Sequence, residues 1–480
     1  MRKESIVNGM VACAEGGVAA ADASRLTVKA ESGSRSFRRT SFRLVILIIL
    51  AAEAFFNPFQ LISQPMQKAL FIGIITIALV YGLKNGLSLR NVKYPGLAYL
   101  AVLFGITTSV FMSAAFHQQT LKQSLVTTAP YFFSYLTFFV FMKLNVSRRR
   151  TMSFVMLLLG VSTLVYFINL FHVPFNVFGD SMLESEDMTR GIIRLPVPYI
   201  LLYPVTIFYA INRWLESHKR KWLLVVAWCG TLVVLSVTRQ VILFTALLGL
   251  MFVFQRYDWK RKLMLIVGVV AVVVWVLPMI PIYNTMIELS ESQKDDSDMG
   301  EENVRITAAR YYGYENQTNA LSPVFGNGMP SFGVSKWGVM MDSETQENGC
   351  FWVDIGWIGF YWLYGGIATI GMIVMFVRAL MRKKNSAEQY INYSLWFLIL
   401  VSIASGPPVY YHQIVIICLM WFMALKPHLE ESEKPDRENV ENSTDNTELQ
   451  QCGRYPQLSA VGGAPQLGAR QDGSRGQRLA

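Results

Sequence analysis

The sequence predicts an all-α, polytopic membrane protein with about twelve transmembrane helices. Of its 480 residues, 52% are apolar and only 16% are charged, whereas a soluble protein would carry about 25% charged residues. Apolar runs long enough to cross about 30 Å of hydrocarbon as a helix recur along the chain. These runs are residues 43–57, 68–84, 95–115, 121–143, 151–173, 195–213, 221–238, 239–256, 261–282, 354–378, 391–406 and 408–425.

Two polar ends flank the predicted membrane body. Residues 1–42 and 427–480 hold few large apolar side chains and cannot bury enough surface to offset chain entropy, so we expect disordered cytoplasmic extensions there. Between them, nine predicted helices occupy 43–282, one long loop occupies 283–352, and three helices occupy 353–426. Because no separate soluble domain fits, any chemistry must lie at helix ends, in the long loop or in a cavity between helices.

The basic residues predict the orientation. Alternate connectors carry nineteen lysines and arginines, and the opposite short connectors carry five. Positive residues stay cytoplasmic, so both termini are expected inside and the long loop outside. The net charge of +10 therefore indicates membrane lipids as contacts and no nucleic acid. Cys350, in the long loop, would report the sidedness of that loop if its thiol is exposed.

Arg239 is the sharpest candidate for a binding residue. It stands between two apolar runs joined by almost no connector, which predicts a tight hairpin with Arg239 at its outward tip. A guanidinium there could reach lipid headgroups, or it could clamp a phosphate, because its planar fork matches two oxyanion oxygens.

Arg194 is a second predicted outward cation. An Arg-Gly-Ile-Ile-Arg sequence over 190–194 ends directly before the sixth apolar run. Arg194 could pair with acids of its own loop, or it could face the same cavity as Arg239.

The long loop contains three further patterns. A short helix is predicted around Arg305 and Tyr312, and a turn is predicted over 323–328, which reads Pro-Val-Phe-Gly-Asn-Gly. The turn lacks the preceding strand and the third glycine of a dinucleotide fingerprint. Aromatic residues where the chain re-enters the membrane could form an interfacial belt or stack on sugars: Trp352, Trp357, Tyr361 and Trp362.

Taken in order, these motifs resemble a known family. They are the hairpin Thr238-Arg239-Gln240, the Arg-Gly-x-x-Arg segment before the sixth helix, the long outer loop with an arginine near its start, the Pro-x-x-Gly-x-Gly turn and an Asp-x-Gly-x-x-Gly sequence over 354–359. Over residues 43–425 the chain resembles the superfamily of O-antigen polymerases and O-antigen ligases. The resemblance implies a metal-independent glycosyltransferase of the bacterial inner membrane that needs no cofactor. It implies undecaprenyl-diphosphate-linked oligosaccharide as substrate, and a chain-length regulator and flippase of the same pathway as partners.

One departure from the family pattern favours a polymerase over a ligase. Ligases of the family carry a histidine with an adjacent asparagine near the end of the long loop, and here the comparable place reads Gln-Glu-Asn-Gly-Cys over 346–350. The general base is then open among Glu347, Asp354 and His412. Asp354 could instead cap the tenth helix, and His412 could be a packed side chain.

The expected mechanism follows from the implied substrate. A lipid diphosphate leaves readily once its charge is neutralised, so we expect Arg239 and Arg305 to form the main clamp and Arg194 to supplement it. The acceptor hydroxyl needs a proton acceptor as it attacks the anomeric carbon. A ligase with another acceptor and a flippase or transporter remain alternatives. Transporters usually show two similar halves, and this sequence has no internal repeat.

Overall fold

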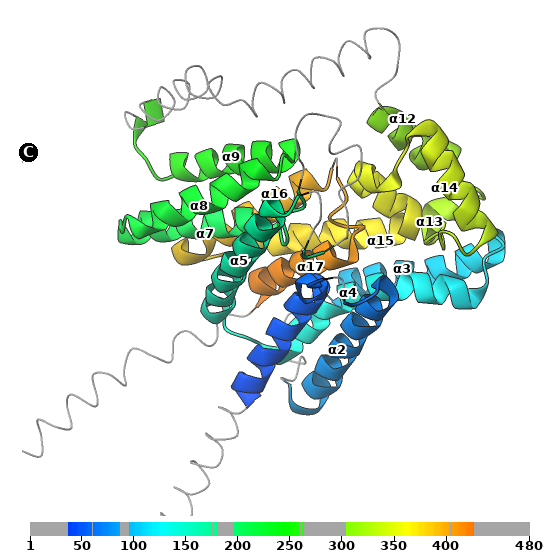
Figure 1. Cartoon of the computed structure of the whole chain (residues 1–480), viewed down its shortest axis with the longest axis horizontal. Coiled ribbons are helices and arrows are strands. Elements are labelled where there is room, and N and C mark those ends of the chain that lie inside the picture. The colour runs from blue at the N-terminus through cyan, green and yellow to red at the C-terminus, as the bar shows by residue number, and fades with distance from the viewer. Residues whose placement is uncertain are drawn as a thin grey trace, which may run out of the picture. The chain divides into compact units, whose positions relative to one another are not determined.

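The computed structural model describes residues 37–59, 61–86, 96–173, 177–179, 195–259, 262–263, 304–403 and 405–426 (Figure 1). Several predicted features lie outside these residues: the arm up to residue 36, the loop 180–194 with Arg194, nearly all of the ninth apolar run, the acidic start of the long loop and the tail 427–480.

Within the described ranges the chain is all-helical, and no strand is formed there. An isolated bridge joins Pro58 and Phe178. After a first helix over 37–52, the elements are η1 (Ala54–Phe56), α2 (Gln64–Asn85), α3 (Gly96–Phe116), α4 (Leu121–Leu144), α5 (Arg148–Phe171), α7 (Leu202–Ser217), α8 (Lys221–Leu235), α9 (Arg239–Phe254), α12 (Val304–Arg310), the π-helix η5 (Tyr311–Glu315), α13 (Ser322–Phe325), α14 (Lys336–Asn348), η6 (Trp352–Ile355), α15 (Gly356–Met381), η7 (Ser386–Glu388), α16 (Gln389–Val401) and α17 (Tyr411–Leu425).

Five of the described segments are long and apolar enough to cross a membrane. They are Gln64–Asn85, Gly96–Phe116, Leu121–Leu144, Arg148–Phe171 and Trp352–Met381, the last of which joins η6 to α15. The prediction of an all-α protein with membrane-spanning helices is confirmed at this level. Helices α8, α9 and α17 are also apolar, but they are shorter; a helix of their length extends only about 23 Å.

Two predicted runs begin earlier in the sequence than the helices they contain. The run 195–213 becomes helical only at Leu202, after Pro196 and Pro198, and the run 408–425 only at Tyr411, after two further prolines. Proline lacks the N–H of a helical hydrogen bond and disfavours helical backbone in the residue before it. The sequence-based starts of these two helices were therefore wrong.

Helix α17 is buried on all sides. Every residue from Ile414 to Leu425 is buried, as expected of a helix that is apolar all round. Helices α4, α15 and α16 pack against it. Tyr135 of α4 donates a hydrogen bond to the carbonyl oxygen of Pro408, 3.0 Å away, just before α17 begins.

Helices α3 and α15 approach each other closely through small residues. A Cβ atom added at Gly105 would lie 2.6 Å from the Cβ of Ala368, and one at Gly371 would lie 2.7 Å from the carbonyl oxygen of Ala98. Small residues at a crossing let two backbones approach, which is a common form of helix contact in membranes.

Residues 304–355 form a helical layer from α12 to η6, which we call the outer layer after the side of the membrane that the sequence predicts for it. It docks where α15 is broken at Gly365, whose φ is 77°. The amides of Asn327 and Gly328 each donate a hydrogen bond of 2.9 Å to the carbonyl oxygens of Trp362 and Leu363. A Cβ at Gly328 would lie 2.4 Å from the backbone oxygen of Ser109 in α3. The predicted glycine turn thus wedges the outer layer between α3 and α15.

Candidate functional site

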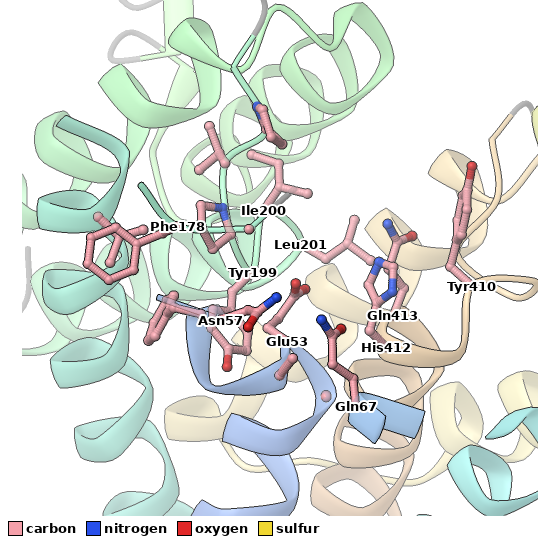
Figure 2. Close-up of a pocket in the computed structure, with 18 of the residues that line it drawn as sticks. Glu53, Asn57, Gln67, Phe178, Tyr199, Ile200, Leu201, Tyr410, His412 and Gln413 are labelled. Atoms are coloured by element: carbon pink, nitrogen blue, oxygen red, sulfur yellow. The ribbon is translucent and has the colours of Figure 1, made fainter. Parts of the chain in front are cut away.

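A cavity of about 840 Å³ lies between the end of the first helix, the starts of α2 and α17, helix α5 and the segment 195–201 (Figure 2). The hairpin between α8 and α9 adds Ser236 and Thr238 to its wall. Pockets of about 300–1,000 Å³ take small-molecule ligands. Its polar and aromatic lining includes Glu53, Phe56, Asn57, Gln64, Gln67, Lys68, Asn169, Phe178, Tyr199, Tyr410, Tyr411, His412 and Gln413.

The backbone that follows Glu53 turns in the left-handed sense. Ala54, Phe55, Phe56 and Asn57 have φ angles of 46°, 54°, 66° and 39°. For L-residues this conformation costs about 1–2 kcal/mol each. Strained backbone of this kind concentrates at functional sites, where the surrounding structure holds it in place. Here the turn ends the first helix at the cavity wall.

Two asparagines hold this turn. The side chain of Asn57 accepts a hydrogen bond from the amide of Ile62 at 3.0 Å and donates one to its carbonyl oxygen at 3.1 Å. Asn169 of α5 makes the same pair of bonds with Phe178, at 3.0 and 2.9 Å. The bridge between Pro58 and Phe178 joins the two segments. Both asparagines therefore stabilise the backbone that forms the wall of the cavity.

Glu53, Lys68 and His412 are ionisable residues of the cavity whose polar groups bind no described residue. Within the described part of the chain, none of these three side chains makes a hydrogen bond or a salt bridge. Figure 2 shows the side chains of Glu53 and His412, with Gln67 of α2 labelled between them. The cavity thus holds a carboxylate, an ammonium and an imidazole that are available to a ligand.

Three helix N-termini converge on the cavity. Helices α2, α9 and α17 begin at Gln64, Arg239 and Tyr411, and residues at each of these starts line the wall. None of the three N-cap side chains bonds to the first turn of its helix. Each N-terminus therefore offers backbone N–H donors and about half a positive charge. Such ends favour anions.

Arg239 lies beside this cavity. Helix α8 ends at Leu235 and α9 begins at Arg239, so the predicted tight hairpin is present. In the short connection between the two helices, Val237 has a left-handed backbone conformation with a φ of 53°. Arg239 is exposed, and its neighbour Thr238 lines the cavity. Arg194 lies outside the described residues, and the residue that follows it, Leu195, lines the cavity.

The other predicted site residues lie in the outer layer. Arg305 is exposed on α12, Glu347 is exposed near the end of α14, and Asp354 is exposed in η6; none of them lines the cavity. The N-cap of α15 is Ile355, and no side chain caps it, so the alternative role of Asp354 as helix cap was wrong. Of the three predicted bases, the structure brings only His412 to the cavity.

A buried histidine joins the outer layer to the end of α3. His117 stacks on Trp337 with ring centroids 4.0 Å apart, and its Nε2 lies 3.3 Å from the hydroxyl of Thr318. Burial lowers the pKa of His117 to about 4, although a hydrogen bond with Asn327 opposes the shift. The imidazole is therefore neutral at physiological pH and serves as a packed side chain.

Cys350 is 4% exposed, and burial raises the pKa of its thiol. Tyr312 donates a hydrogen bond to its carbonyl oxygen at 3.1 Å. An exposed thiol at this position is therefore excluded in the folded outer layer.

Sequence reasoning missed Glu53 as a site residue. It lies inside the first apolar run, at 43–57, where it is the only charged residue besides Arg43 at the start. An ionisable residue at membrane depth is by default a functional candidate, so this signal was present in the sequence. Lys68 entered only as a charge in a connector, although it stands one turn into α2 at the cavity.

No group of three or more His, Cys, Asp or Glu side chains is arranged to hold a metal ion among the described residues. The chain matches no protein-family model, and no curated protein matches its sequence.

Proposed function

We propose that this protein is a membrane glycosyltransferase that polymerises undecaprenyl-diphosphate-linked oligosaccharide repeat units at the outer face of a bacterial inner membrane. Its product would be an O-antigen, a capsule or an exopolysaccharide. The observation that carries the proposal is the convergence of three helix N-termini on one cavity, with Lys68 in its wall and Arg239 at its hairpin.

The residues that line the cavity suit both the diphosphate and the sugars of such a substrate. A diphosphate needs positive potential and N–H donors, which helix N-termini, an ammonium and a guanidinium supply. Sugars need amide groups for their hydroxyls and aromatic rings for their apolar faces. Gln64 and Gln413 offer amides, and Tyr410 and Tyr411 offer rings.

The direction of three helices supports the orientation within the proposed topology of twelve spans with both termini cytoplasmic. From the cavity, α2, α9 and α17 run toward Lys84, Arg256 and Lys426 at or just beyond their other ends. Basic residues mark the cytoplasmic side, so the cavity would face outward. Because α9 and α17 are short, their N-termini would lie below the outer surface, where a lipid carrier can reach them.

In the proposed reaction, a hydroxyl of one lipid-linked unit attacks the anomeric carbon of another, and the lipid diphosphate leaves. Arg239, Arg194 and Arg305 are the proposed cations for the leaving group, and Arg239 is the one that the structure describes at the cavity hairpin. Oriented donors stabilise charge that develops in the transition state. Of the three predicted bases, His412 is the one that lines the cavity.

The lipid-linked glycans of a strain that lacks the gene test this function. A polymerase predicts carriers that hold a single repeat unit at the outer face of the membrane. Long chains left on the carrier would instead identify a ligase. Single units trapped on the cytoplasmic face would identify a flippase. Restoration of the polymer by the wild-type gene is the control.

A further inference from the structure

We propose that Glu53 is the general base that takes the proton of the acceptor hydroxyl. This inference rests on the proposed function and names the catalytic residue of the same cavity. Among the described residues that line the cavity, Glu53 is the single carboxylate. The other described lining residues supply an ammonium, an imidazole, amides and aromatic rings, so Glu53 is the anionic proton acceptor among several groups suited to an anion.

The position of Glu53 is set by the backbone around it. Glu53 follows the first helix directly and precedes the left-handed turn 54–57. That turn is held by the side-chain hydrogen bonds of Asn57 with the backbone of Ile62 and of Asn169 with the backbone of Phe178. A strained segment that is fixed by its surroundings places the residue it carries.

Among the described residues, no side chain holds the carboxylate of Glu53 in place. Glu53 makes no hydrogen bond and no salt bridge with its side chain in the described part of the chain, and Lys68 of the same cavity is not paired with it. A partly buried carboxylate without a partner is unfavourable unless function retains it. Figure 2 shows Glu53 among the residues that line the cavity.

His412 suits a different task. It is the second residue of α17, and its ring stacks on Tyr410 with centroids 5.6 Å apart. The N-terminus of α17 carries the positive end of the helix dipole, which favours an anion beside His412. An imidazole N–H there can donate a hydrogen bond to an oxyanion. His412 and Lys68 therefore bind the leaving diphosphate, and Glu53 takes the proton of the acceptor hydroxyl.

The proposed step balances without a further reactant. The O–H bond of the acceptor sugar breaks, and its proton moves to a carboxylate oxygen of Glu53. The freed electron pair forms the new bond from oxygen to the anomeric carbon. The bond from that carbon to the phosphate oxygen breaks, and its electron pair leaves on undecaprenyl diphosphate. Glu53 then releases the proton to water through the open cavity.

The test uses full-length protein in liposomes, supplied with lipid-linked glycan extracted from cells that lack the gene. E53Q keeps the shape of the side chain and cannot accept the proton, so we expect turnover to fall by about 10²- to 10⁴-fold. The matched control is E216Q, at a partly exposed pair in which Arg213 lies 3.3 Å from Glu216; turnover should stay within about twofold of wild type.

Two further measurements separate catalysis from positioning. E53Q should keep the thermal stabilisation that added undecaprenyl diphosphate gives the wild type, because the carboxylate does not hold the leaving group. In E53A, added formate should restore turnover severalfold, since the small carboxylate can enter the vacated space. Formate should have no effect on E53Q, in which that space is filled.

The outcomes distinguish the two proposals. If wild-type protein elongates glycan and E53Q does so within about tenfold of its rate, Glu53 is not the base and the polymerase proposal stands. The same conclusion follows if E53Q loses undecaprenyl diphosphate binding and formate rescues nothing. If wild-type protein in liposomes elongates nothing, the proposed function and this inference both fall.

Discussion

Polar residues around the cavity divide into those that hold the wall and those that face the space. Asn57 and Asn169 each make two hydrogen bonds to backbone, so their loss would leave backbone groups unsatisfied, at about 1–3 kcal/mol each. Glu53, Lys68 and His412 make none with described residues. Substitutions of these three should therefore change activity with little effect on folding.

Arg239→Lys should lose most activity, because an ammonium cannot reproduce the bidentate fork of a guanidinium. We expect a fall of about 10²-fold or more in polymerisation rate, measured per folded protein. Arg239 is exposed, so protein level should hold. Arg149→Lys, at an exposed arginine in the first turn of α5, is the matched control. If Arg239→Ala still makes polymer of wild-type length, Arg239 does not clamp the diphosphate and only contacts lipid headgroups.

His117 should make the fold sensitive to acid. Its pKa is lowered from 6.5 to about 4 in the folded state, so below about pH 6.5 the unfolded chain binds a proton that the folded chain does not. The stabilisation is complete at neutral pH and is lost as pH falls toward 4. The thermal midpoint of purified protein should therefore drop between neutral pH and about pH 5.

His117→Phe checks the cause of this drop. A phenyl ring keeps the stack on Trp337 and cannot be protonated, so the acid dependence should flatten. His172→Phe, at an exposed histidine after α5, should retain the wild-type dependence. An equal drop in His117→Phe and wild type would assign the acid sensitivity to other groups.

At the scale of elements, apolar length predicted where helices form, and local chemistry set where they end. Prolines delay the starts of α7 and α17. The break of α15 at Gly365 and the left-handed turn after Glu53 depend on partners far along the chain. No window of the sequence contains those partners, so neither feature could be predicted from it.

Arg148 shows the same limit. The sequence used it only as one of the nineteen basic residues that set orientation. In the structure it is buried, pairs with Glu388, and donates to the carbonyl oxygens of Met423 at 2.9 Å and Lys426 at 2.8 Å. It therefore ties the start of α5 to the end of α17, and its loss would remove a charge partner of the buried Glu388.

Gly356→Ala should disrupt the joint between η6 and α15. Gly356 has φ 44°, and an added Cβ would lie 1.8 Å from the carbonyl oxygen of Ser402. We expect a loss of at least about 2 kcal/mol in the free energy of unfolding, read as a lower thermal midpoint. At Gly160, inside α5, an added Cβ meets nothing within 4 Å. Gly160→Ala should gain about 0.5–1 kcal/mol, and equal effects at both sites would contradict this account.

At the scale of the molecule, the sequence predicted the all-helical class, and some of its candidate site residues lie at one cavity. Arg239 and His412 were singled out, and the structure places the Arg239 hairpin and His412 around one cavity. Arg305, Asp354 and Glu347 belong to the outer layer. The cavity itself combines residues from 52 to 416, and linear spacing cannot indicate such an assembly.

The proposed topology predicts which positions an impermeant thiol reagent can reach. Ser343→Cys, exposed on α14, should be labelled by such a maleimide once only the outer membrane is permeabilised. Asn385→Cys, exposed in the connector after α15, should be labelled only after the inner membrane is opened. The reverse pattern would invert the orientation. Native Cys350 should react slowly in either case because it is buried.

The wedge at Gly326, Asn327 and Gly328 also sets an order in time. This segment leaves the ribosome after α3 and before α15, and the chain is made from its N-terminus. While α15 is still unmade, the carbonyl oxygens of Trp362 and Leu363, which the wedge needs, do not yet exist. In the proposed topology, residues 304–355 would therefore cross the membrane before the α15 carbonyl groups that bind them have been made. The outer layer can dock fully only after α15 has been made. A chain whose synthesis stalls before α15 would lack the helix on which Asn327 and Gly328 dock.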